Sequence, residues 1–172
     1  ATPLAVAAGA GHAAVCQLLL ERKANVSLTN DVGHTALHSA ASSGCADTCR
    51  VLLARKASPA ACDSGKRTPL HVAAANNQPA ACEALIKAKA NISAVDAYHH
   101  TPLHLAAQNG HSSVCKRLVE LKADINARIF GSQALHCAAE HGQAECCAML
   151  VELKADINRA DHGGYTPLMR AA

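Results

Sequence analysis

Aromatic residues are scarce in this sequence, which has no Trp, two Tyr and one Phe among its 172 residues. Half of the chain is nevertheless hydrophobic, so its apolar content consists of Ala, Leu, Val, Ile and Cys. Side chains of this size favour thin elements that approach one another closely, and they exclude a thick core centred on aromatic rings. A hydrophobic share of 50% is too high for a disordered chain, so we expect a folded protein.

Long apolar runs and strong charge are also absent. No run approaches the roughly 18 residues that a membrane-spanning helix needs, which excludes membrane insertion. The 16 basic and 13 acidic residues are spread along the chain, and their formal net charge of +3 does not predict nucleic-acid binding. Residue 1 is Ala and no targeting segment precedes the first motif, so we expect a piece of a longer protein.

The sequence lacks the short motifs of common enzymes. It contains no Gly-x-Gly-x-x-Gly, no phosphate-binding loop with Gly-Lys-Ser/Thr, and no Gly-x-Ser-x-Gly. Seven of the glycines fall at predicted turns, namely Gly33, Gly44, Gly65, Gly110, Gly142, Gly163 and Gly164. We therefore expect neither catalysis nor a cofactor.

The sequence does contain a long internal repeat. Its opening motif, Thr-Pro-Leu-His in the clearest copies, begins at Thr2, Thr35, Thr68, Thr101, Gln133 and Thr166. Successive motifs are 33 residues apart, except that Gln133 follows Thr101 by 32. A fixed period of this length is typical of a solenoid. The units are residues 2–34, 35–67, 68–100, 101–132 and 133–165, with a partial unit at 166–172, in one domain spanning 1–172.

Each unit predicts two short helices. In the fourth unit Thr101 is a good N-cap, and the Pro after it suits the first helical turn. The turn at 109–111 ends the first helix, and Val114 and Leu118 give the second helix an apolar face. The second helix ends near the segment Lys-Ala-Asp-Ile-Asn at 122–126.

These motifs resemble the ankyrin repeat over the whole chain, most clearly at 101–111, 123–126 and 161–168. The resemblance implies an all-α solenoid of stacked antiparallel helix pairs with β-hairpin-like finger loops. At about 10 Å per stacked unit, five units predict a rod on the order of 50 Å long. The resemblance also implies a protein partner, bound through the fingers and the exposed ends of the first helices.

One departure from the family pattern is systematic, because Lys stands where Gly usually closes the second helix. The positions are Lys23, Lys56, Lys89, Lys122 and Lys154. If they are left-handed, each costs on the order of 1 kcal/mol relative to Gly, partly offset by the helix dipole. A tolerated cap is one interpretation, and a basic column for an acidic partner is the other.

Nine cysteines, an odd number, argue against a closed disulfide framework. Five of them share one repeat position on the second helix, namely Cys16, Cys49, Cys82, Cys115 and Cys147. Neighbours in this column should lie about 10 Å apart, beyond the roughly 4.4–6.8 Å between Cα atoms of a disulfide. We interpret them as buried small hydrophobes and expect a cytoplasmic or other reducing compartment. Cys62 is the thiol that we expect to be most exposed.

The histidines also repeat. The resemblance implies that His38, His71, His104 and His136 are buried and hydrogen-bond to neighbouring backbone. His-x-x-x-Cys at His12 and His111 could place two metal ligands on one helical face. Because a structural zinc site needs four ligands, we predict no metal site.

Function should lie at positions that vary between units. The predicted partner-binding residues are Val32, His34, Arg67, Tyr98, His100, Gln108, Asn109, Ile129, Phe130, Ser132, Glu140, His141, His162 and Tyr165. All three aromatic residues fall in predicted fingers, where they are typical interface anchors. The alternative is that the shortened finger folds back and buries Phe130. His99 and Lys66 replace the usual finger Gly, which leaves the shape of those two hairpins open.

We therefore predict a non-catalytic protein–protein interaction module that acts as a scaffold or adaptor. The alternative is a structural accessory subunit of a larger assembly, or a targeting domain of a larger protein. Because neither end has a polar capping helix, further repeats or a partner should cover the end faces.

Overall fold

The structure is a computed structural model that describes residues 2–172. It contains helices and loops, with one isolated β-bridge between Ile129 and Ser132 in the described chain. The helices are α1 (Pro3–Gly9), α2 (Ala13–Glu21), α3 (Ala36–Ser42), α4 (Ala46–Ala54), α5 (Pro69–Ala75), α6 (Pro79–Lys87), α7 (Pro102–Gln108), α8 (Ser112–Glu120), α9 (Ala134–Glu140), α10 (Ala144–Glu152) and α11 (Pro167–Arg170). This confirms the predicted all-α architecture.

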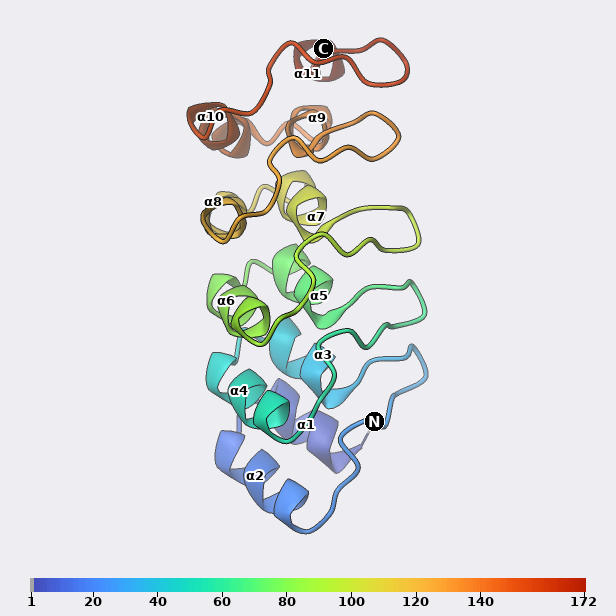
Figure 1. The fold of residues 1–172 in the computed structure, drawn as a ribbon, viewed down its shortest axis with the longest axis vertical. Coiled ribbons are helices and arrows are strands. Elements are labelled where there is room, and N and C mark those ends of the chain that lie inside the picture. Colours follow the sequence, from blue (N-terminus) through green and yellow to red (C-terminus); the bar gives the residue numbers. More distant parts are fainter. Residues whose placement is uncertain (1) are drawn as a thin grey trace.

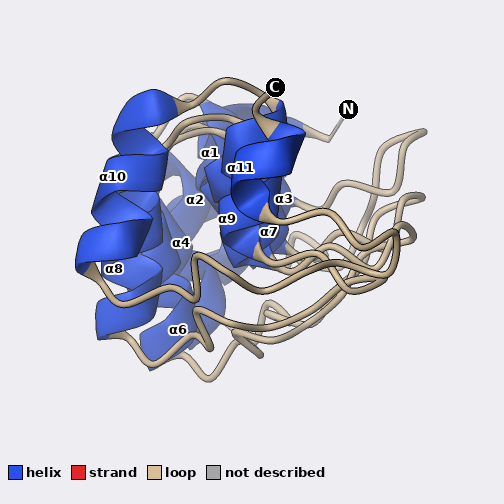
Figure 2. Cartoon of the chain, turned by 90° about the horizontal axis from the view of Figure 1, so that it is seen from above, coloured by secondary structure: helices blue, strands red, loops and turns tan. Residues whose placement is uncertain are grey.

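The helices form two parallel columns. Odd-numbered helices stack into an inner column and even-numbered helices into an outer one, as Figure 1 shows. Seen along the stack, the long loops all project to one side, next to the inner column (Figure 2). We call these loops fingers 1 to 5 and define them by residues 30–34, 63–67, 96–100, 129–132 and 161–165.

Thr and His together begin most inner helices. In α3 and α5 the Thr side chain and the His three residues later form a capping box, with His in the role usually taken by Glu or Gln. His38 Nδ1 accepts the backbone N–H of Thr35 at 3.2 Å, so the ring proton resides on Nε2, which donates to the Arg67 carbonyl at 3.1 Å. Burial lowers the pKa of His38, which favours this neutral form.

The predicted backbone link of these histidines is confirmed in three units and wrong in one. His71 and His136 reach the carbonyls of His100 and Tyr165 at 3.0 and 3.1 Å, as His38 reaches Arg67. His104 is fully buried, but its Nε2 has no hydrogen-bond partner among the described residues. The fourth unit is one residue shorter, so the acceptor carbonyl lies 28 rather than 29 residues along the chain, at Ser132.

The lysine that follows each outer helix is left-handed, as the departure from Gly implied. The φ angles of these lysines are 66° at Lys23, Lys56 and Lys89, 76° at Lys122 and 72° at Lys154. Around Lys89 the pattern is a Schellman motif, because Lys89 N–H donates to the Ile86 carbonyl and Ala90 N–H to the Leu85 carbonyl. The backbone is therefore that of a glycine cap, formed by Lys.

The core runs as a narrow strip between the columns. Its largest apolar side chains are fully buried leucines, one or two in most units, at Leu37, Leu52, Leu70, Leu85, Leu103, Leu118 and Leu150. Each contributes roughly 1.5–3 kcal/mol by leaving water. Fully buried alanines such as Ala73 and Ala106 allow the close approach of neighbouring inner helices that the sequence predicted.

The cysteine column is buried in four units but not in the last. Cys16, Cys49, Cys82 and Cys115 are fully buried, whereas Cys147 is only half-buried and its neighbour Cys146 is fully buried. Column cysteines occupy the fourth position of an outer helix. In the first outer helix, α2, the third residue Val15 is 45% exposed and the fourth residue Cys16 is buried. In the last outer helix, α10, the third residue Cys146 is buried and the fourth residue Cys147 is half-buried. The third position therefore faces the preceding unit and the fourth faces the following one.

The two end faces of the stack are apolar. Val6, Val15 and Leu18 are 62%, 45% and 51% exposed in the first unit, and Leu168 and Met169 are 81% and 59% exposed in α11. The expected cover for these faces, further repeats or a partner, stays a prediction. None of the helices in residues 2–172 is long and apolar enough to cross a membrane.

Candidate protein-binding surface

Four of the five fingers are built around the side-chain oxygen of one Asp or Asn residue. In finger 2, Asp63 Oδ1 accepts the backbone N–H groups of Gly65 and Arg67 at 2.8 and 2.9 Å. Asp96 and Asp161 do the same in fingers 3 and 5, and Asn30 in finger 1. The finger shape is thus held from within by an Asx turn, which leaves the remaining side chains free to face outward.

The left-handed residue of each of these fingers keeps the same conformation whether or not it is Gly. The φ angle is 81° at Gly33, 58° at Lys66, 65° at His99 and 80° at Gly164. The substitutions at Lys66 and His99 therefore leave the backbone of those two hairpins in the left-handed region, where a side chain costs on the order of 1 kcal/mol.

Charge is divided unequally on fingers 2 to 5. The aspartates Asp63, Asp96 and Asp161 are only 5–7% exposed, whereas Lys66 and Arg67 point to solvent. Burial alone would raise the pKa of Asp63, but hydrogen bonds from Arg67 and Gly65 outweigh it and leave the pKa below its usual value. The carboxylates are thus structural, and the charge that finger 2 offers to a partner is cationic.

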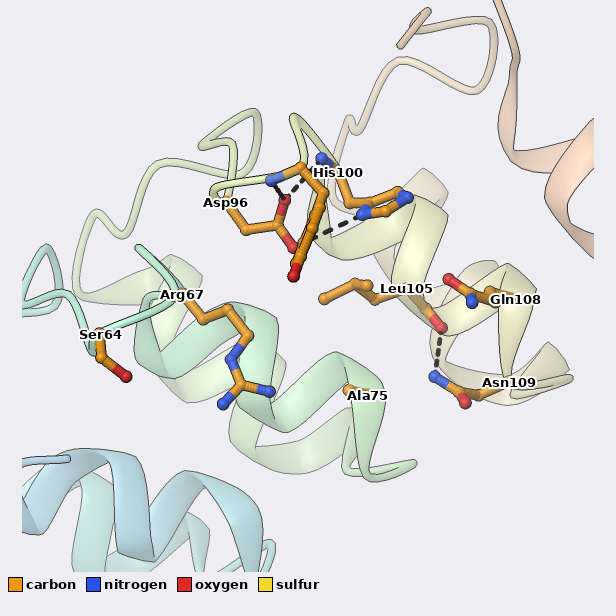
Figure 3. Close-up of a pocket in the computed structure, with 10 residues that line it drawn as sticks. Ser64, Arg67, Ala75, Asp96, His100, Leu105, Gln108 and Asn109 are labelled. Carbon is orange, nitrogen blue, oxygen red and sulfur yellow. Dashed lines mark hydrogen bonds and ion pairs between the residues drawn. The ribbon is translucent and has the colours of Figure 1, made fainter. Parts of the chain in front are cut away.

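A groove lies between fingers 2 and 3 and the inner helices α5 and α7. Its volume is about 630 Å³, and Figure 3 shows Leu105 and Ala75 within it, with Arg67 on one side and Gln108 and Asn109 at its far end. The other residues that line it are Ser64, Gly65, Asp96, Tyr98 and His100. The arrangement combines a small apolar floor with polar and aromatic walls, which suits side chains of a bound polypeptide segment.

Arg67 and His100 face the groove from equivalent finger positions. The Arg67 guanidinium binds Asp63 Oδ2 through Nε and Nη2, both at 2.8 Å, which orients it across the groove. His100 Nδ1 lies 3.5 Å from Asp96 Oδ2. The Arg67 side chain is therefore positioned by the aspartate of its own finger, whereas His100 Nδ1 has no hydrogen-bond partner among the described residues.

The structure brings five of the predicted partner-binding residues together in this groove: Arg67, Tyr98, His100, Gln108 and Asn109. Exposed elsewhere on the fingers and inner-helix ends are Val32, Phe130, Glu140, His141, His162 and Tyr165. His34 and Ser132 are half-buried, and His34 Nε2 contacts Asp63 Oδ2 at 3.2 Å.

Finger 4 differs from the others and corrects one prediction. Ile129 and Ser132 exchange two backbone hydrogen bonds of 2.8 Å, and Phe130 and Gly131 between them have φ of 44° and 87°. Positive φ at both central residues is the pattern of a type I′ hairpin turn. Ile129 is 8% exposed and is not accessible to a partner, whereas Phe130 is 69% exposed. The expected exposure of Ile129 is wrong, and so is the alternative in which Phe130 is buried.

Phe130 extends an aromatic patch at the finger tips. Its ring meets the His99 ring edge-on with centroids 5.2 Å apart, and Tyr98 beside His99 is 72% exposed. We call Tyr98, His99 and Phe130 the aromatic tip cluster. A bulky residue held at positive φ costs on the order of 1 kcal/mol, and such strain is commonly kept at functional sites.

The predicted partner-binding residues left out five residues of the groove, namely Ser64, Gly65, Ala75, Asp96 and Leu105. A usable signal was present, since Asp63 and Asp96 recur at the 33-residue period that was used for other positions. Ala75 and Leu105 carried no such signal, because their exposure depends on how two neighbouring units pack.

The paired His and Cys positions are not arranged as a metal centre. His111 Nε2 bonds to the Ala75 carbonyl at 3.0 Å, which ties α8 to the end of α5. Residues 2–172 contain no group of three or more His, Cys, Asp and Glu side chains placed to hold a metal ion.

The geometry defines a class of protein: a helix-pair solenoid whose finger side carries a groove. Comparison with protein families identifies the particular family, because the family model described as ankyrin repeats (3 copies) matches residues 1–63, 57–129 and 127–172. The chain belongs to the ankyrin repeat family. Its members are generally protein–protein interaction modules, and the fold is typically non-catalytic.

Solved structures confirm the fold. The human ASB11 ankyrin repeat domain is similar to this chain, with a TM-score of 0.90 and 24% sequence identity over all of this chain and 77% of that one. No curated protein sequence matches the chain. A fold shared with 545 solved chains does not identify a partner, so function has to be argued from the site.

Proposed function

We propose that this chain is a non-catalytic scaffold or adaptor that holds a segment of a partner protein against its fingers and inner-helix ends. The observation that carries the proposal is the groove of about 630 Å³ between fingers 2 and 3 and helices α5 and α7. Five side chains at positions that vary between units line it, which is where a repeat protein can acquire specificity without disturbing its core.

The aromatic tip cluster lies on the same side of the molecule and also supports binding there. Tyr98 belongs both to the cluster and to the groove, so the two features form one continuous surface. Exposed aromatic rings are costly to leave in water and are enriched at the centres of interfaces. A partner segment that fills the groove and covers the Tyr98 and Phe130 rings would bury the most apolar part of the finger side.

The chemistry of the surface supports binding and not catalysis. The buried carboxylates Asp63 and Asp96 are occupied with finger backbone, and the repeated histidines with helix caps. The free thiols of all nine cysteines support action in a cytoplasmic or other reducing compartment.

The test is affinity capture with the wild-type chain and with a Tyr98→Ser, Phe130→Ser double variant, followed by mass spectrometry. Both side chains are exposed, so the double variant should keep the circular dichroism and thermal stability of the wild type. We expect it to lose a partner that the wild type captures. Leu28→Ser, which removes a 49% exposed apolar side chain from the loop between α2 and finger 1, is the matched control and should keep the partner.

Two results would count against the proposal. If both variants keep the partner, the binding surface lies away from the fingers. If no form captures a partner, the alternative of a structural part in a larger protein is favoured.

A further inference from the structure

Two cysteines from neighbouring units touch in the core. Cys115 of α8 and Cys146 of α10 have their Sγ atoms 3.6 Å apart, and both residues are fully buried. A disulfide has an S–S distance of about 2.05 Å, so a shift of about 1.5 Å would bring these atoms into bonding distance.

This pairing follows from the register of the outer helices. The fourth residue of each outer helix faces the third residue of the next, and the fourth residues are Cys16, Cys49, Cys82 and Cys115. The third residues opposite them are Thr48, Ala81, Val114 and Cys146. Among the four junctions of the described outer helices, this register places Cys opposite Cys at one.

The same part of the stack contains buried polar atoms without a hydrogen-bond partner. Two of the four buried side-chain atoms without a hydrogen-bond partner in residues 2–172 are His104 Nε2 and Gln133 Oε1, on the inner helices of these two units. Fingers 2 and 3 each donate one backbone bond to the finger before, Ser64 N–H to Val32 and Ala97 N–H to Gly65. Ile129 N–H instead bonds within finger 4, to Ser132. Other hydrogen bonds join the two units, such as those from Gln143 to the Gln108 carbonyl and from Asp156 N–H to Asn126, so a small oxidant reaches the thiols through local opening of the stack.

The two thiols differ in acidity in the way that oxidation requires. Their mutual hydrogen bond, and then burial, raises the pKa of Cys115. The hydrogen bond from Cys115 lowers the pKa of Cys146. Cys146 is therefore the sulfur that more readily becomes a thiolate, the form that reacts with peroxides.

We propose that Cys115 and Cys146 form a redox modification site, which a small peroxide converts into a disulfide that joins α8 to α10. The Cys146 thiolate attacks one oxygen of hydrogen peroxide and becomes a sulfenic acid, while the other oxygen leaves as hydroxide and takes up a proton to form water. The Cys115 sulfur then attacks the Cys146 sulfur, the S–S bond forms and the S–O bond breaks, and the sulfenic oxygen leaves with the proton of the Cys115 thiol as a second water. Two thiols are oxidised and one peroxide is reduced.

The test is peroxide treatment of the folded chain in a Cys62→Ser background, which removes the exposed thiol that would cross-link two molecules. After hydrogen peroxide, free thiols are blocked with N-ethylmaleimide, and peptides are mapped without reductant. We expect a disulfide between Cys115 and Cys146 as the main intramolecular product, with dithiothreitol restoring both thiols.

Neighbouring residues provide matched controls. Cys147→Ser changes the adjacent, half-buried cysteine and should leave the yield of this cross-link unchanged, whereas Cys146→Ser should abolish it. If circular dichroism shows that Cys146→Ser does not fold, Cys115→Ser, which removes the other cysteine of the pair, replaces it in the test. The proposal would be overturned if the main cross-link formed between any other pair of cysteines. It would also be overturned if Cys115 and Cys146 both remained free thiols under conditions that oxidise Cys147.

Discussion

Replacing Lys89 with Gly should stabilise the protein, although it removes a charged side chain at the end of a helix. Lys89 has a φ of 66° and is the left-handed residue of the Schellman motif that ends α6. That conformation costs an L-residue about 1–2 kcal/mol. Gly avoids this cost but loses about 0.5–1 kcal/mol through the greater entropy of the unfolded chain, and a few tenths more are lost with the cation. The net gain should be about 0.5 kcal/mol.

The same substitution at Lys116 is a control that should change the free energy of unfolding in the opposite direction. Lys116 lies within α8 and is exposed, and neither lysine forms an ion pair with a described residue. There the right-handed backbone suits Lys, so Lys116→Gly should cost about 1 kcal/mol. The two variants change the same atoms, and only the backbone conformation differs.

The assay is urea unfolding followed by helical circular dichroism, with unfolding free energies compared at an unchanged slope. Combining Lys56→Gly, Lys89→Gly and Lys122→Gly should add up to about 1.5 kcal/mol, because the sites lie in separate units. If Lys89→Gly destabilises the protein as much as Lys116→Gly does, the strain argument is refuted.

Three further predictions concern acid, glycine and thiols. Burial lowers the pKa of His104 to about 4, below its unfolded value of about 6.5, so the unfolded chain binds the proton first. Stability should be full above about pH 6.5 and fall by up to about 3 kcal/mol toward pH 4; a flat urea midpoint across this range would contradict it. Gly131→Ala should destabilise far more than Gly142→Ala at similar positive φ, because a Cβ at Gly131 collides with the His162 backbone nitrogen and one at Gly142 meets nothing within 4 Å. Thermal unfolding of both variants measures the difference, and equal shifts would show that the finger yields. With a bulky maleimide, Cys62 should be labelled fast, and Cys16, Cys49, Cys82 and Cys115 slowly, as followed by mass spectrometry; uniform rapid labelling would contradict their burial.

Residues that recur at the repeat period were predictable, because a repeated environment selects the same side chain. Thr35 and His38 recur as helix caps, and Lys56 recurs at the left-handed cap. Even there the sequence is incomplete. In the shortened fourth unit His104 Nε2 lacks the hydrogen bond to a finger carbonyl that its counterparts make, and the loss of one residue changes which side chains of finger 4 point inward.

The sequence by itself determined the family, the helix pairs and the side of the solenoid on which binding should be sought. These follow from local rules of capping, periodicity and turn formation that act within about 33 residues. The tertiary structure decided what depends on contacts between units: that Arg67, Tyr98 and Leu105 line one groove, that Phe130 is exposed while Ile129 is buried, and that Cys115 meets Cys146. Such contacts depend on the distance and rotation between neighbouring units, which no single repeat encodes.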